Sequence, residues 1–259
     1  MQGLLRNPLA DGSTLGVSSG ASLGAVTAIL LGVSFPGLPF SGSMVMAILF
    51  AFLSLTLILT LAWGLDRSLA TNTIILIGVI FSMFATSVLS LLTAFSGEKL
   101  RSVTFWTMGS LASADYADAL TLGLTLLLCG GVLLTRSREL NAFAMGEDNA
   151  HHLGVAVRRV KLTVMIAVSV LIGVCVAIGG AIGFVGLVTP HMVRMLTGPN
   201  HRRLLPACLF GGAIFLMLCD LVARTVVSPV ELPIGVVTSL IGAVVFVAVF
   251  YRARKAGGA

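Results

Sequence analysis

Charged side chains are scarce in this sequence: Asp, Glu, Lys and Arg make up 10% of its 259 residues. A soluble globular chain carries about 25% charged residues. Hydrophobic residues account for 57% of the chain, and the mean hydropathy is +1.07. This composition excludes an ordinary soluble domain and favours a protein embedded in a lipid bilayer.

Motifs that drive chemistry are also missing. The chain has no G-x-x-x-x-G-K-[ST] loop, so no nucleotide site is predicted. It has no H-E-x-x-H motif, and its four histidines are not grouped with carboxylates, so we predict neither a metal site nor a cofactor. Paired membrane carboxylates suited to a proton relay are absent, which argues against a secondary transporter. The four cysteines lie in apolar stretches without C-x-x-C spacing and are interpreted as packing residues.

Apolar stretches separated by short polar joints fill nearly the whole chain. Most are about 20 residues long, the length that an α-helix needs to cross ~30 Å of hydrocarbon. They occupy residues 14–33, 43–64, 72–95, 116–135, 160–179, 181–197, 204–227 and 233–251. The pattern predicts an all-α polytopic membrane protein with about eight transmembrane helices, as a single domain over residues 1–259.

The basic residues predict the orientation of these helices. Consecutive joints between membrane-spanning helices lie on opposite sides of the bilayer. When the 16 Lys and Arg are assigned to the two sides in this way, 13 fall on one side, and only Lys99, Arg101 and Arg224 fall on the other. Cytoplasmic joints are enriched in Lys and Arg, so both termini are expected in the cytoplasm of a cell-membrane protein. Because cations at helix ends are explained by anionic lipid headgroups, no nucleic-acid partner is predicted.

The longest cytoplasmic joint, residues 137–158, is predicted to hold two short helices. Gly146 breaks the helical pattern, and Glu147 begins a second helix where negative charge is favoured. Gly154 suits the position just after the second helix. On the other side, the joint at residues 96–115 contains Trp106 and predicts a short helix near the outer surface.

The helix pair in this joint carries apolar side chains that we expect to be exposed, namely Leu140, Phe143, Met145 and Leu153. They predict a docking site for a soluble partner. The alternative is an amphipathic connector that rests on lipid.

Glycines and a proline weaken the sixth stretch. Pro190 removes a helix hydrogen bond, and Gly183 is one of several glycines that precede it. His191 and Arg194 follow one turn apart, so these four residues are candidates for a gate or moving seam. A structural histidine and an arginine that reaches the membrane interface are the alternatives.

Asp220 and Arg224 are spaced i,i+4 at the end of the seventh stretch. The spacing predicts an intramembrane ion pair. Glu231 follows in the outer joint, so Arg224 and Glu231 are also candidates for docking an external partner.

The first stretch has Gly16, Gly20 and Gly24 at four-residue spacing, which predicts close approach of another helix. The same region reads G-x-S-x-G around Ser18. A membrane-embedded hydrolase that uses Ser18 and His191 is therefore an alternative, provided that the two side chains lie within hydrogen-bonding reach.

Taken together, four blocks resemble the permease subunits of ATP-binding-cassette importers for iron-siderophores, haem and cobalamin. They are Arg-Asn-Pro-Leu-Ala-Asp at 6–11 with residues 15–21, residues 140–154 with Met-Gly-Glu-Asp, residues 180–191 with 198–206, and residues 220–224 with 231–238. They stand in the family's order along the whole chain.

The resemblance implies a non-enzymatic channel subunit that pairs with a second copy or a paralogue. Cytoplasmic ATPase subunits would drive it, and an extracytoplasmic substrate-binding protein would deliver the cargo. The segment 140–154 would be the ATPase-coupling element, with Leu140, Phe143, Gly146, Glu147, Leu153 and Gly154. Residues 72–95 and 233–251 would line the passage, and Arg224 would meet acidic residues of the binding protein.

Members of the resembled family usually have ten spans, two of them before the Asn-Pro-Leu-Ala block. Here that block begins at residue 7. We therefore expect a longer native polypeptide, and we expect the ladder of Gly16, Gly20 and Gly24 to lack its neighbouring helix.

Overall fold

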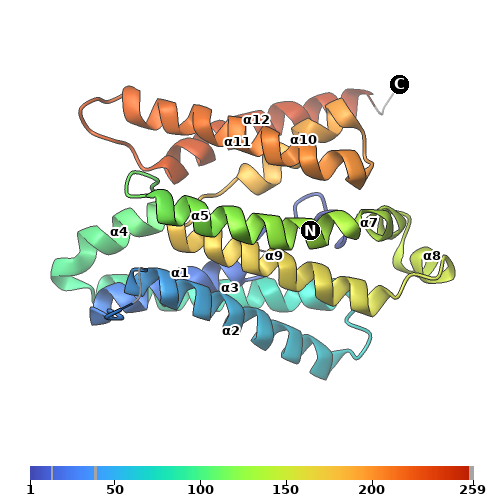
Figure 1. Ribbon diagram of the computed structural model, residues 1–259, viewed down its shortest axis with the longest axis horizontal. Helices are drawn as coiled ribbons and strands as arrows, with labels where there is room; N and C mark the ends of the chain where they lie inside the picture. The colour runs from blue at the N-terminus through green and yellow to red at the C-terminus, as the bar shows by residue number, and fades with distance from the viewer. Residues whose placement is uncertain (13, 38–39, 257–259) are drawn as a thin grey trace.

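The computed structural model describes residues 1–12, 14–37 and 40–256, and every regular element in that part is helical (Figure 1). Each predicted apolar stretch contains a helix. In chain order these are α1 Val17–Leu31, α2 Gly42–Leu65, α3 Thr71–Ala94, the run from α5 Tyr116–Thr125 through the π-helical turn η2 Leu126–Gly130 to α6 Gly131–Thr135, α9 Val157–Gly179, α10 Val185–Thr197, α11 His201–Thr225 and α12 Ile234–Ala256. The all-helical membrane fold is thus confirmed.

The helices differ in how far they could reach through a bilayer. Within the described residues, five are long and apolar enough to cross it, namely α2, α3, the continuous run 116–135, α9 and α11, whereas α1 and the apolar part of α12 are shorter. Helix α10 has 13 residues, or about 20 Å of helix at ~1.5 Å per residue. The predicted span 181–197 is therefore a non-helical lead of residues 180–184 followed by a short helix, as its glycines allow.

Two packed groups build the molecule (Figure 1). Helices α1, α2, α3 and α9 form one group, with α5 lying along α9, and α10, α11 and α12 form the other. Small side chains such as Ala21, Ala25, Ala47 and Ala51 are almost fully buried in the first group, which lets the helix backbones approach closely.

The glycine ladder of α1 already has neighbours. A Cβ at Gly20 would lie 2.5 Å from the hydroxyl of Ser54, and one at Gly24 would lie 2.3 Å from the carbonyl of Met46, both on α2. A Cβ at Gly16 would collide with Phe81 of α3. The expectation that this face lacks a neighbour is therefore wrong, because α2 and α3 fold back onto it.

Short helices occupy the two ends of the bundle. The pair α7 Ser137–Ala144 and α8 Glu147–His152 lies at one end, and α4 Leu100–Met108, preceded by the 3-10 turn η1 Gly97–Lys99, lies at the other (Figure 1). The link between α11 and α12 lies at the α4 end. The predicted short helices in the joints 96–115 and 137–158 are therefore present.

Candidate functional site

The α7–α8 pair forms a sharp elbow because its joint residue has a conformation that glycine favours. Gly146 has φ +118°, and Gly154, just after α8, has φ +82°. The Gly146 amide donates to the carbonyl of Phe143, and the Gly154 amide donates to that of His151. Both predicted helix boundaries thus follow from glycines at positive φ.

The apolar residues of the elbow divide into two sets. Met145 and Leu153 are each 64% exposed, whereas Leu140 is 4% and Phe143 0% exposed within the main core. The expectation that Leu140 and Phe143 are exposed was wrong. Their spacing of three residues directs both side chains of the short amphipathic helix into the bundle, where they anchor α7. Of these four apolar residues, Met145 and Leu153 remain available to a partner.

Glu147, the first residue of α8, connects the elbow to two long helices. One carboxylate oxygen accepts a hydrogen bond from Lys161 Nζ of α9 at 2.6 Å, and the other accepts one from the hydroxyl of Thr71, the first residue of α3. Lys161 is 1% exposed and also donates to the carbonyl of Leu69 at 2.9 Å. The site therefore joins α8, α9 and the start of α3 through one buried charge.

A second polar contact ties α7 to the start of α11. The Asn141 side-chain oxygen accepts from the backbone N–H of His201 at 2.9 Å and lies 2.8 Å from its Nδ1. The Asn141 amide donates to the Asn200 side chain at 3.0 Å. Sequence reasoning missed Asn141, Lys161 and Thr71. A lysine within an apolar stretch was a usable signal for Lys161, but its partner lies 14 residues away on another element.

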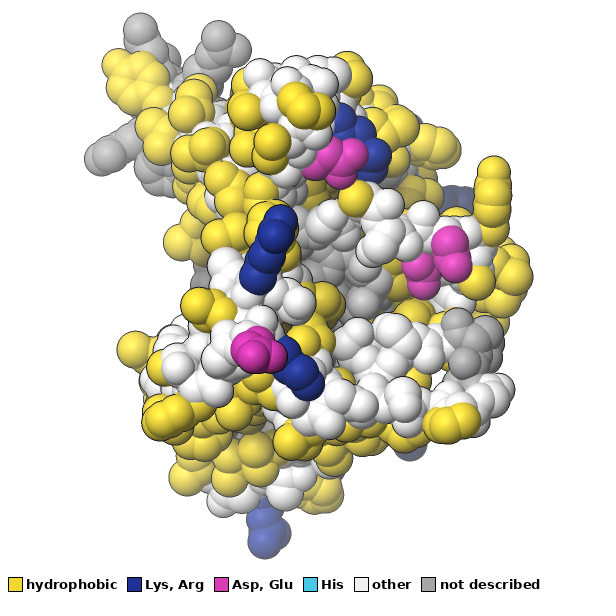
Figure 2. Space-filling model, turned by 90° about the vertical axis from the view of Figure 1, so that its left-hand side faces the viewer, with side chains coloured by type: hydrophobic (Ala, Val, Ile, Leu, Met, Phe, Trp, Pro, Cys, Tyr) yellow, Lys and Arg dark blue, Asp and Glu magenta, His cyan; other side chains and the backbone are white. Residues whose placement is uncertain are grey.

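At the opposite end, Arg224 lies between two carboxylates. Its Nε donates to Asp220 at 2.8 Å, which confirms the predicted ion pair, and its Nη1 lies 3.6 Å from Glu231. The side chains of Arg224 and Glu231 are 42% and 50% exposed. Figure 2 views this end of the molecule, where basic and acidic side chains are few among hydrophobic ones. The three groups together carry a formal charge of −1.

The residues of the predicted seam on α10 face different neighbours. Pro190 lies inside the helix, and Gly183 lies in the non-helical lead. The ring of His191 lies edge-on to Phe246 of α12, with 6.0 Å between ring centroids. Arg194 instead donates to the Gln2 side chain at 3.1 Å. His191 and Arg194 thus have different contact partners, although they lie one turn apart on the same helix.

The hydrolase alternative finds no support in this arrangement. Ser18 belongs to α1, and a Cβ built at Gly12 would lie 2.8 Å from its hydroxyl and 3.0 Å from the side chain of Ile172. His191 packs against α12. Among the residues that the structure describes, no hydrogen bond joins the two side chains.

Comparison with known proteins decides the family. The profile described as the FecCD transport family matches residues 1–252. The chain belongs to this family. It is a permease of the binding-protein-dependent ABC importer type, and neither the hydrolase nor the secondary-transporter alternative is supported.

Similar proteins match this FecCD permease over nearly its whole length. It is 43% identical over 257 residues to the uncharacterized ABC transporter permease protein YvrB of Bacillus subtilis, covering 99% of this chain and 72% of the relative. It is 40% identical over 258 residues to the hemin transport system permease protein HmuU of Yersinia pestis, covering 98% and 76%. A solved structure, described as a metal-chelate type ABC transporter in an inward-facing conformation, is 38% identical with a TM-score of 0.89, covering 97% of this chain and 79% of that one.

Proposed function

We propose that this chain forms the passage of an ATP-driven importer for a metal chelate such as an iron-siderophore, haem or cobalamin. Cytoplasmic ATPase subunits would bind the α7–α8 elbow, and an extracytoplasmic binding protein would bind the opposite end. The observation that carries the proposal is the elbow itself. It presents Met145 and Leu153 outward while Glu147 ties it to α3 and α9.

This architecture suits the transmission of movement. A partner that displaces α8 would pull on Glu147, whose two oxygens bind the first residue of α3 and a buried lysine of α9. Helices α3 and α12 are the proposed walls of the passage. Most of α3 is uncovered in the single chain, with Leu76, Met83 and Phe84 60–67% exposed. A second copy or a paralogue facing α3 would enclose the passage.

The charge distribution supports the orientation. The elbow lies on the side that holds 13 of the 16 basic residues, so we place it, and both termini, in the cytoplasm. Arg224, in the last turn of α11, then lies at the outer end, where the link from α11 to α12 is found. Asp220 and Glu231 both contact the Arg224 guanidinium, and the contact with Glu231 is the longer of the two. A carboxylate of the binding protein would therefore have to compete with Glu231 for Arg224.

The names of the relatives support the proposed cargo class. The names of two similar permeases state hemin and vitamin B12 transport, and the structural neighbour is described as of metal-chelate type. A third relative is named as a molybdate importer permease. We propose a metal chelate rather than an oxyanion because α3, a proposed wall of the passage, presents bulky apolar side chains, which suit an organic chelate better than a small anion.

Co-purification with a matched pair of variants tests the partner assignments. The tagged chain is extracted from its native membrane, and the attached proteins are identified by mass spectrometry. Leu153→Asp should reduce recovery of an ATPase at least tenfold and leave recovery of a binding protein unchanged. Val230→Asp alters a similarly exposed residue, 61% against 64%, at the opposite end and should leave ATPase recovery unchanged. Equal ATPase loss in both variants, or no ATPase with the unmodified chain, refutes the proposal.

A further inference from the structure

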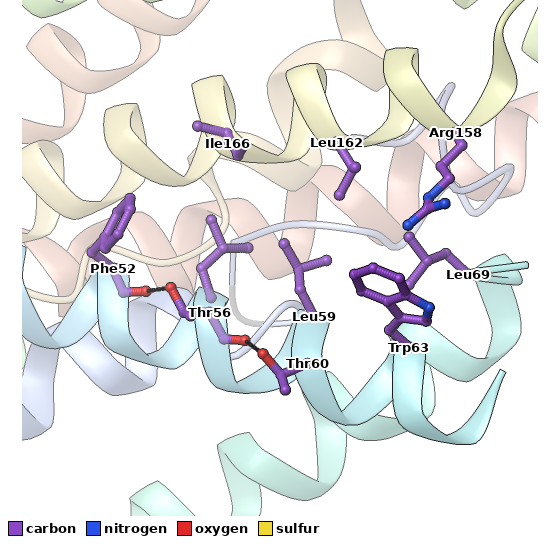
Figure 3. A pocket seen from close by; sticks show the side chains of 10 residues that line it. Phe52, Thr56, Leu59, Thr60, Trp63, Leu69, Arg158, Leu162 and Ile166 are labelled. Carbon is purple, nitrogen blue, oxygen red and sulfur yellow. Dashed lines mark hydrogen bonds between the residues drawn. The ribbon is translucent and has the colours of Figure 1, made fainter. Parts of the chain in front are cut away.

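Helices α2 and α9 leave a groove of about 200 Å³ open at the surface (Figure 3). Its main lining residues are Phe52, Thr56, Leu59 and Trp63 of α2 and Leu162 and Ile166 of α9. Phe52 and Trp63 are 54% and 50% exposed. Because cargo pockets usually have volumes of about 300–1,000 Å³, the groove suits a slender apolar chain better than a chelate.

The wall of the groove is apolar despite its two threonines. The Thr56 hydroxyl donates to the carbonyl of Phe52 at 2.9 Å, and the Thr60 hydroxyl donates to that of Thr56 at 2.7 Å (Figure 3). Both hydroxyl hydrogens are therefore bound within α2, and the methyl groups remain for packing. From Phe52 to Trp63 the groove follows α2 for about 16 Å at ~1.5 Å per residue. That length matches one leaflet of hydrocarbon, about 15 Å.

A cation closes one end of the groove. The guanidinium carbon of Arg158 lies 4.6 Å from the centroid of the Trp63 ring, and Figure 3 shows the side chain directed from α9 toward the indole. None of the ion pairs within the described part of the chain involves Arg158. Stacking engages the flat face of a guanidinium and leaves its N–H donors at the edge free, in a geometry that matches phosphate oxygens.

We propose that this groove binds one anionic phospholipid, with an acyl chain against α2 and α9 and the headgroup phosphate on Arg158. The charge argues for this occupant: the mouth carries an exposed, stacked arginine on the side of the protein that holds 13 of the 16 basic residues. An apolar groove one leaflet long with a cation at headgroup depth is complementary to a lipid. The proposal rests on the membrane fold alone and not on the cargo or the ATPase.

Tryptophan fluorescence tests the site directly. The chain has two tryptophans, so a Trp106→Phe background leaves Trp63 as the only indole. The full chain is reconstituted into phosphatidylcholine vesicles that contain brominated phosphatidylglycerol or, separately, brominated phosphatidylcholine at the same mole fraction. We expect brominated phosphatidylglycerol to occupy the groove beside Trp63, and so to quench its fluorescence, with roughly fivefold higher affinity than brominated phosphatidylcholine. One basic residue near the membrane surface gives an anionic lipid about this preference.

Two variants separate the site from general attraction to the membrane. Arg158→Gln should bring the ratio of the affinities for phosphatidylglycerol and phosphatidylcholine close to one. Arg159→Gln changes an exposed neighbour that does not line the groove, so it should leave this ratio near the original value. Inorganic phosphate at millimolar concentration should not reduce quenching, since the acyl chain holds the headgroup in place. Equal quenching by both lipids, an unchanged preference in Arg158→Gln, or a Trp63 that neither lipid quenches because protein covers it would each overturn the proposal.

Discussion

Replacing Glu147 with Gln should loosen the α7–α8 elbow, because it leaves a buried charge without its counter-ion. Lys161 is 1% exposed and would keep only uncharged acceptors in direct contact, namely the Leu69 carbonyl and the amide oxygen of the substituted side chain. Removing one member of a buried ion pair costs about 3–5 kcal/mol. Since the Glu147 side chain is 31% exposed, water screens the pair in part, so we expect about 2–3 kcal/mol.

Hydrogen–deuterium exchange across residues 145–154 measures this loss locally. If the elbow opens without unfolding the bundle, ~2–3 kcal/mol corresponds to a roughly 30- to 150-fold increase in exchange rate, at about 1.4 kcal/mol per factor of ten. Asp148→Asn is the matched control. It removes a neighbouring, exposed acidic residue of α8 and should change exchange far less.

The double variant Glu147→Gln with Lys161→Met tests whether the unpaired lysine causes the loss of protection. Because the cost of the single change lies in the unpaired cation, removing the lysine charge as well should restore a large part of the lost protection. Exchange in Glu147→Gln within threefold of the original rate would refute the argument. So would a double variant whose elbow exchanges as fast as that of the single one.

Three further outcomes follow from local geometry. Gly146→Val places a branched side chain at φ +118°, at a cost of about 1–3 kcal/mol. Uptake into vesicles should therefore fall while membrane insertion persists. Gly123→Val, at an open helical position, is the control. Arg224→Glu should weaken association with the binding protein more at low than at high salt, and an equal loss at both would contradict a docking role. The hydrogen bonds from the Ser68 side chain and the backbone of Ser68 and Ala70 lower the pKa of Asp66, so the turn they form is stable above pH ~4 and lost as the pH falls through the lowered value. After correction for intrinsic rates, exchange at residues 66–70 should be constant between pH 5 and 8, and a change within that window would count against this role.

The positions of the helices could be predicted from the sequence because their causes are local. Apolar length alone located the eight helical stretches, and glycines placed both boundaries of the elbow at Gly146 and Gly154. The i,i+4 spacing of Asp220 and Arg224 predicted their ion pair correctly, since residues one turn apart on a helix must face the same way. The family resemblance drawn from four short sequence blocks is confirmed by the family match over residues 1–252.

The face of each helix that meets protein depends on the packing of the whole bundle and could not be predicted from local sequence. In a chain this apolar, core-facing and lipid-facing side chains are chemically alike, so the sequence of α3 could not show that Ile77 is buried and Leu76 exposed. The apolar spacing of α7 marked one face of that helix but could not show whether the face meets the bundle or a partner. Local sequence could not show that α2 and α3 fill the Gly16, Gly20 and Gly24 ladder. Nor could it pair Lys161 with Glu147 and Thr71, because that contact joins three elements whose approach depends on the packing of the entire bundle.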